Sequence, residues 1–93
     1  MQKKLTGNEC YNFISDSGHA WIAVKKSHIT ELGLNDNISK FSYVKNNSVF
    51  LEEDSDARKF FEAYKNRFGY VPDFTETLTD GQSKIRQYDR YTG

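Results

Sequence analysis

The chain has 93 residues, a length that supports one modest domain with a thin hydrophobic core. Its 13 basic and 13 acidic residues balance, which excludes a general attraction to nucleic acid or to an anionic membrane through net charge. Disordered chains are poor in aromatic residues, but this chain holds seven Phe, six Tyr and one Trp. We therefore expect a single folded domain over residues 1–93, with a core built mainly from aromatic rings.

The cysteine count and the hydropathy of the chain indicate the cellular compartment that we expect for it. Cys10 is the single cysteine, so an internal disulfide is excluded, and no cluster of Cys and His has the spacing of a zinc site. No segment approaches the ~20 apolar residues of a membrane-spanning helix, and no apolar run follows the first lysines. We expect a soluble, cytoplasmic protein that needs no metal or cofactor and no membrane, with a mobile start at residues 1–9.

The first predicted elements are a β-hairpin and a short helix. Residues 11–14 and residues 20–24 favour strands, and the turn-forming residues 15–18 separate them. A helix is then predicted over residues 27–34, with Ser27 as its N-cap.

A second hairpin comes next along the chain. Residues 38–44 alternate well enough for a strand, in which Phe41 and Tyr43 share a face. The Asn-Asn pair at 46–47 suits a tight turn because asparagine tolerates the left-handed conformation. Residues 48–52 form the returning strand, so this hairpin extends the sheet.

The strongest pattern predicts a helix over residues 54–68. Asp54 or Ser55 can cap its start, acidic residues lie early, basic residues lie late, and Gly69 suits a left-handed end. The apolar positions recur at helical spacing. They are Ala57, Phe60, Phe61, Tyr64 and Phe68.

The last third of the chain predicts one more strand and an ambiguous end. Residues 73–78 favour a strand, and Pro72 suits the start of an edge strand. Residues 82–93 are polar and rich in Arg and Tyr, and form either a docked strand or a partner-dependent tail. The elements together predict an α+β fold: a small, mostly antiparallel sheet of about five strands, packed against the main helix (54–68) and the short helix (27–34).

His19 is the first candidate for chemistry. It follows Gly18 on a hairpin shoulder, and histidine titrates near neutrality. A lone histidine without an orienting carboxylate or a nucleophile is more often structural or on the surface. The acidic run at residues 52–56 has enough oxygen for a hard cation, but acids at a helix start explain it more simply.

Residues 84–91 interleave basic residues with aromatic rings. If this segment is extended, Lys84, Arg86, Tyr88 and Arg90 share one face and form a cationic stripe around one ring. Such a stripe can grip phosphates and stack on bases, or serve a protein interface, where Arg and Tyr are enriched. The two arginines and Tyr88 are therefore the main candidate binding residues.

We predict a binding site of Arg86, Tyr88 and Arg90, with His19 and Tyr43 as neighbours if the sheet brings them together. The neutral net charge counts against general nucleic-acid binding. A specific macromolecule or a small anionic ligand held by the arginines fits better. No phosphate-binding glycine loop, serine-nucleophile elbow or dinucleotide fingerprint is present, which makes enzyme activity the less favoured hypothesis.

Five blocks of the sequence, in this order, resemble a family of small uncharacterised proteins of bacteria and their phages. They are Gly-His-Ala-Trp at 18–21, Glu-Leu-Gly-Leu at 31–34, Ile-Ser-Lys-Phe-Ser-Tyr at 38–43, Leu-Glu-Glu-Asp-Ser-Asp at 51–56 and Ser-Lys-Ile-Arg-Gln-Tyr at 83–88. The resemblance supplies no activity and no site residue. It implies a phage association, and with it a protein that binds and blocks host machinery.

The sequence supports three functional hypotheses. The leading one is a non-enzymatic interaction protein that binds a host or phage protein complex in the bacterial cytoplasm, narrowed by the resemblance to a phage-encoded inhibitor of host defence such as an anti-CRISPR. The second is a binding module for a small anionic ligand or nucleic acid that uses the Arg/Tyr C-terminal segment. The third is a small enzyme centred on His19 with carboxylate help.

Overall fold

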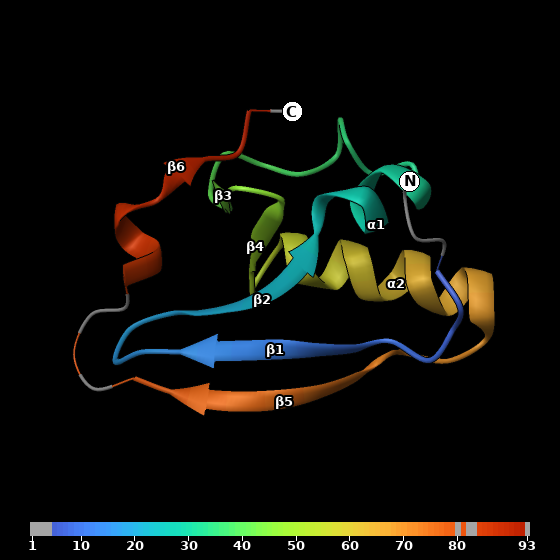
Figure 1. The fold of residues 1–93 in the computed structure, drawn as a ribbon, viewed down its shortest axis with the longest axis horizontal. Helices are drawn as coiled ribbons and strands as arrows, with labels where there is room; N and C mark the ends of the chain where they lie inside the picture. The colour runs from blue at the N-terminus through green and yellow to red at the C-terminus, as the bar shows by residue number, and fades with distance from the viewer. Residues whose placement is uncertain (1–4, 80, 82–83, 93) are drawn as a thin grey trace.

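In the computed structural model, the described residues (5–79, 81 and 84–92) form one sheet of six strands, two α-helices and a short 3₁₀-helix (Figure 1). The strands are β1 (Cys10–Ser15), β2 (Ala20–Lys25), β3 (Tyr43–Lys45), β4 (Ser48–Glu52), β5 (Asp73–Leu78) and β6 (Asp89–Arg90). The helices are α1 (Lys26–Glu31), α2 (Asp56–Phe68) and the 3₁₀-helix η1 (Lys84–Gln87). The spatial order of the strands is β5-β1-β2-β4-β3-β6, and every pairing is antiparallel except that of β1 with β5. The α+β prediction is confirmed.

One face of the sheet packs against α2. Strand alternation places Ile22 opposite Leu51 on this face, and both side chains are fully buried in a cluster with Phe60 and Tyr64 of the helix. The Tyr11 ring meets the Phe60 ring edge-to-face at 5.3 Å between centroids. Burying side chains of this size stabilises the fold by about 1.5–3 kcal/mol each. Aromatic rings therefore form much of the core, as the composition predicted.

The charged residues in its first and last turns and the glycine after it account for where helix α2 begins and ends. Asp56 lies in the first turn and Lys65 and Arg67 in the last, which complements the helix dipole. Gly69 ends the helix at φ 87°, and its N–H donates to the Lys65 carbonyl at 2.7 Å. The prediction of a helix over residues 54–68 is confirmed, although the first two of those residues form a turn before it.

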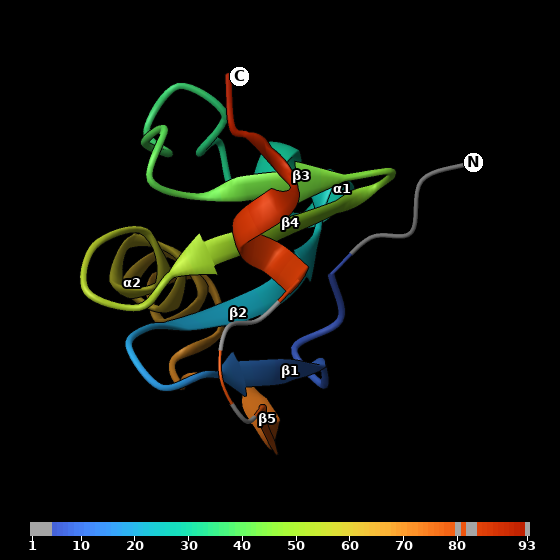
Figure 2. The same ribbon diagram turned by 90° about the vertical axis from the view of Figure 1, so that its left-hand side faces the viewer.

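The C-terminal segment covers part of the other face of the sheet (Figure 2). Ile85 of η1 is buried, and the Tyr88 ring lies 5.1 Å from the Phe50 ring of β4. Strand β6 then pairs with β3, and Tyr91 is buried. Residues 84–92 are thus docked on the domain, first as a helical turn (84–87) and then as the short strand β6 (89–90), and not as one continuous extended strand. Residues 82, 83 and 93 lie outside the described residues.

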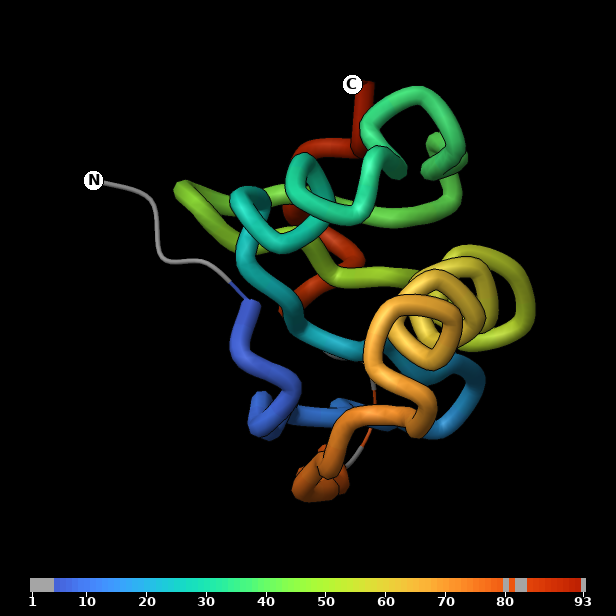
Figure 3. The backbone as a smooth tube through the Cα atoms, turned by 90° about the vertical axis from the view of Figure 1, so that its right-hand side faces the viewer, coloured from blue at the N-terminus to red at the C-terminus, as the bar shows by residue number. Residues whose placement is uncertain are grey.

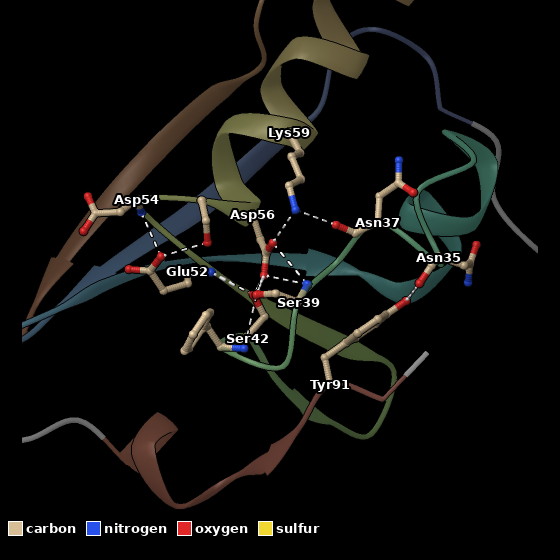
Figure 4. A network of polar contacts seen from close by, with 11 residues as sticks. Asn35, Asn37, Ser39, Ser42, Glu52, Asp54, Asp56, Lys59 and Tyr91 are labelled. Atoms are coloured by element: carbon tan, nitrogen blue, oxygen red, sulfur yellow. Dashed lines mark hydrogen bonds and ion pairs between the residues drawn. The ribbon is translucent and has the colours of Figure 1, made fainter.

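Two sequence predictions were wrong in detail. Of the predicted strand 38–44 only the last two residues lie in a strand, β3, which extends to Lys45. Ser39 and Ser42 donate to the buried Asp56 carboxylate and hold the residues before β3 in a turn (Figure 4). The short helix begins at Lys26 and ends at Glu31, so Ser27 lies inside it and does not cap it. The Asn46-Asn47 turn is confirmed, with Asn46 at φ 54°.

The start of the described chain is tied to the domain. Leu5 is buried, and its N–H donates to the Glu31 carboxylate at 3.0 Å. Residues 5–9, for which we expected mobility, make these and further contacts; residues 1–4 lie outside the described part of the chain. Neither α1 nor α2 has the length and apolar character required of a membrane-crossing helix, and the described residues contain no other candidate.

Candidate functional site

A hollow of about 520 Å³ opens on the sheet face opposite α2, near the start of β2 and β3 and the end of β4. We call it the aromatic hollow. Its rings are those of His19, Trp21, Phe41 and Tyr43. Its remaining lining residues are Glu52, Asp54, Ser55, Arg86 and Arg90.

Strand register brings the rings together. Trp21 pairs with Glu52 across β2 and β4, and Tyr43 pairs with Phe50 across β3 and β4. These positions share one face of the pleated sheet, so Trp21 and Tyr43 are neighbours with ring centroids 6.3 Å apart. The His19 ring lies 6.0 Å from Trp21. The result is a ring-lined floor, in which Trp21 is only 2% exposed while Phe41 at the rim is 61% exposed.

Arg86 reaches the hollow because Asp16 holds its guanidinium. Its Nε and Nη2 donate to the two carboxylate oxygens of Asp16 at 2.7 and 2.9 Å. The Asp16 side chain is fully buried, and it also accepts the N–H groups of Gly18 and His19. The hydrogen bonds that Arg86 donates to Asp16 raise the pKa of Arg86, so its charge is fixed. The Arg86 Cζ lies 5.7 Å from the Trp21 ring, and its Nη1 has no hydrogen-bond partner among the described residues.

Arg90 reaches the hollow from strand β6. Its Nη1 donates to the Lys40 carbonyl at 3.0 Å, and its Cζ lies 5.2 Å from the Tyr43 ring. The residue is exposed, and its other terminal nitrogen makes no hydrogen bond within the described part of the chain. Both arginines thus stack on rings of the floor and keep donor capacity for a ligand.

Two carboxylates balance the arginines. Glu52 accepts the Asp54 N–H at 3.0 Å and the Ser55 hydroxyl at 3.1 Å through one oxygen, which fixes the turn before α2. The Asp54 carboxylate is exposed and makes no hydrogen bond to another described residue. The hollow therefore offers two cationic groups, two anionic groups and a ring surface within one space.

The structure brings together four of the five predicted site residues: His19, Tyr43, Arg86 and Arg90. Tyr88 lies elsewhere, packed on Phe50, with the Lys45 Nζ 4.7 Å from its ring centroid. The extended, outward stripe that motivated the prediction is absent from η1, because Arg86 is bound to Asp16 inside the domain.

Sequence reasoning missed the floor and the acidic side. Trp21 and Phe41 were considered only as strand residues, and Glu52 and Asp54 only as members of an acidic run that could hold a hard cation or begin a helix. The pairing of Trp21 with Glu52 is the signal that joins them, and it becomes visible once the two hairpins are aligned. Among the described residues, no group of three His, Cys, Asp or Glu is arranged to hold a metal ion.

Comparisons with family models, with curated proteins and with solved structures found no match for this chain. The resemblance of its sequence blocks to small bacterial and phage proteins thus stays an expectation. A function for this protein has to be inferred from the geometry of the aromatic hollow.

Proposed function

We propose that the protein is a small-ligand binding module, and that the aromatic hollow takes a small zwitterion with a flat apolar body. The observation that carries this proposal is the convergence of Arg86 and Arg90 with Glu52 and Asp54 around the Trp21 ring. Ligand sites in proteins are typically concave spaces of about 300–1,000 Å³, lined by rings and a few convergent polar groups. At about 520 Å³ the hollow lies in that range.

The charges favour a zwitterion over a simple anion. Arg86 is already neutralised by the buried Asp16, so Arg90 is the main cation without a carboxylate partner. Glu52 and Asp54 would repel a second negative charge on the ligand, whereas an ammonium group would satisfy them. A ligand carboxylate that pairs with an arginine and a ligand ammonium that pairs with an acid use both kinds of charged group in the site.

A set of phenyl compounds tests the ligand class. Phenylalanine carries both charges, phenylpropionate only the anion, and phenethylamine only the cation. We expect phenylalanine to shift the amide resonances of His19, Trp21 and Tyr43 in a ¹H–¹⁵N spectrum at a lower concentration than phenylpropionate or phenethylamine does. Equal responses to phenylalanine and phenylpropionate would show an anion site, and no response in these residues to any of the three would reject the proposal.

Matched variants show which residue binds the carboxylate of the ligand and which binds its ammonium group. Arg90→Gln should weaken the binding of phenylalanine and phenylpropionate and leave that of phenethylamine unchanged. Asp54→Asn should weaken the binding of phenylalanine and phenethylamine and leave that of phenylpropionate unchanged. Each lost charge-assisted contact is expected to cost about 1.5–3 kcal/mol, which is roughly a 10- to 150-fold loss of affinity. Lys65→Gln is the control, because Lys65 lies in the last turn of α2 and outside the hollow.

The other hypotheses stay untested. A protein that binds a host or phage complex, including an inhibitor of bacterial defence, no longer has the outward Arg/Tyr stripe as its premise, since Arg86 is bound to Asp16 and Tyr88 packs on Phe50. An enzyme centred on His19 gains two neighbouring carboxylates in the hollow, and would be indicated by turnover of a bound ligand that His19→Ala abolishes without changing its affinity.

A further inference from the structure

Strand β5 forms one edge of the sheet and is exposed at all six of its positions. It pairs with β1 on one side, and no described strand lies on the other (Figures 1 and 3). An edge of this kind presents backbone N–H and C=O groups that can pair with another strand. The other edge, β6, is only two residues long.

The side chains of β5 divide cleanly between its two faces. Phe74 lies on the α2 side, with its ring 5.9 Å from Phe13 and 6.3 Å from Phe61. Strand alternation places Glu76 and Leu78 on this same side. Phe74 is 47% exposed and Leu78 is 84% exposed, so an apolar, acidic, apolar row faces solvent beside the open edge.

The opposite face of β5 is engaged within the domain. The hydroxyls of Thr75 and Thr77 donate to the Asn12 amide oxygen at 3.3 and 3.1 Å. This arrangement joins β5 to β1 through side chains as well as through the backbone. Selectivity for a partner strand would therefore come from the α2 side.

A second hollow, of about 390 Å³, extends this acidic character. Glu76 and Leu78 line it together with Phe13 and with Glu53, which belongs to the turn before α2. Glu53, Glu76 and exposed apolar surface thus lie together at the carboxyl end of β5, while the third carboxylate of this hollow, that of Asp16, is bound to Arg86. A basic side chain opposite Glu76 would meet complementary charge there.

We propose that β5 receives an extended segment of a partner protein as a seventh strand, and that this segment carries the pattern apolar-x-basic-x-apolar. The backbone of the segment would pair with the open edge of β5. Its basic side chain would lie against Glu76, and its apolar side chains against Phe74 and Leu78. This interface lies at the β5 edge, whereas the aromatic hollow lies on the sheet face opposite α2, and it does not depend on ligand binding there.

A second copy of this chain fits the edge poorly. In an antiparallel pair of β5 strands about a two-fold axis, two registers join nearly the whole strand. One places Glu76 opposite the same residue of the other copy, and like charges directly opposite each other are destabilising. The other places Phe74 opposite Glu76, which leaves an apolar ring against a carboxylate. A basic partner segment avoids both conflicts.

A designed peptide tests the proposal. The probe is the acetylated and amidated peptide Thr-Val-Thr-Lys-Thr-Val-Thr, and the control peptide has Glu in place of Lys. We expect the Lys peptide, at concentrations up to the millimolar range, to shift the amide resonances of residues 73–78 and to slow their hydrogen exchange. The Glu peptide should bind about two- to fivefold more weakly, which is the effect of one cross-strand charge pair.

Charge exchange in the protein makes the test specific. Glu76→Lys should reverse the preference between the two peptides, whereas Glu62→Lys, an exposed position of α2, should leave it unchanged. The proposal is overturned if residues 73–78 do not respond to the Lys peptide, if both peptides act equally on the unmodified protein, or if Glu76→Lys leaves the preference intact. Shifts in residues 73–78 that grow with protein concentration alone would instead identify a second copy as the occupant.

Discussion

The Arg86 guanidinium lies side-on against the Asp16 carboxylate, with Nε and Nη2 donating to separate oxygens at 2.7 and 2.9 Å. The two residues are 70 positions apart in the chain, so this pair fastens the C-terminal segment to the β1–β2 turn. The Asp16 oxygen that accepts from Nη2 also accepts the N–H groups of Gly18 and His19. One carboxylate therefore positions both a cation and an imidazole of the aromatic hollow.

Asp16→Asn should loosen the C-terminal segment. An amide offers one acceptor oxygen in place of two, so the Arg86 fork loses one of its two hydrogen bonds and its opposite charge. We expect faster hydrogen exchange of the amides in residues 84–91 and weaker ligand binding in the hollow. Asp73→Asn is the matched control, because Asp73 is an exposed residue of β5 and does not line the hollow; equal exchange rates in the two variants would contradict this role of Asp16.

The contact of Glu9 with Tyr64 should make stability depend on pH at both extremes. Burial alone would raise the pKa of Glu9, but hydrogen bonds from the Tyr64 hydroxyl, at 2.6 Å, and from Thr6 and Gly7 hold it at about 2. Burial and the same hydrogen bond raise the pKa of Tyr64 to about 12. Stability from Glu9 is thus present above its ordinary pKa of 4.5 and is lost as the pH falls through about 2. Stability from Tyr64 is present below its ordinary pKa of 10 and is lost as the pH rises through about 12.

Tyr64→Phe removes the hydroxyl and tests the acid end of this pH dependence. We expect the free energy of unfolding at neutral pH to fall by about 1.5–3 kcal/mol, the usual contribution of a hydrogen bond to a charged group. Urea unfolding at several pH values should also show a smaller loss of stability between pH 4.5 and 2 than in the unmodified protein. An unchanged acid limb would mean that Tyr64 does not control the pKa of Glu9.

Asp56→Ala should destabilise the turn that precedes β3. The Asp56 carboxylate is fully buried and accepts hydrogen bonds from Ser39 and Ser42, with Lys59 Nζ at 3.3 Å (Figure 4). Burial opposes its charge, but these hydrogen bonds prevail and lower the pKa of Asp56. Removing the carboxylate leaves the buried Ser42 hydroxyl without its acceptor, so we expect a loss of about 2–4 kcal/mol in urea unfolding. Asp36→Ala, at an exposed turn position, should change stability by less than about 0.5 kcal/mol.

Substitutions of two phenylalanines should distinguish a residue that stabilises the fold from one that contributes to ligand binding. Phe60 is fully buried in the core, whereas Phe41 is 61% exposed at the rim of the aromatic hollow. Phe60→Ala should lower the free energy of unfolding by about 3–5 kcal/mol because it leaves a cavity. Phe41→Ala should leave stability within about 0.5 kcal/mol and weaken phenylalanine binding. A large loss of stability in Phe41→Ala would show that the rim is part of the core.

Sequence alone determined the elements whose signals are local. Helix α2 follows from the spacing of Ala57, Phe60 and Tyr64 and from the glycine that ends it, and the hairpins follow from short alternating runs joined by turn residues. Each of these patterns involves residues that are close together in the sequence. They were therefore sufficient to predict the α+β fold.

Tertiary structure decided everything that depends on side chains meeting across the fold. Asp56 binds Ser39 and holds the first five residues of a predicted strand (38–42) in a loop, and Asp16 binds Arg86 across most of the chain. The pairing of β2 with β4 brings Trp21 to Glu52, and the sheet order leaves β5 with an open edge. Each result depends on the register of paired strands or on hydrogen bonds to a buried carboxylate from residues far away in the sequence. No local sequence pattern encodes either of these.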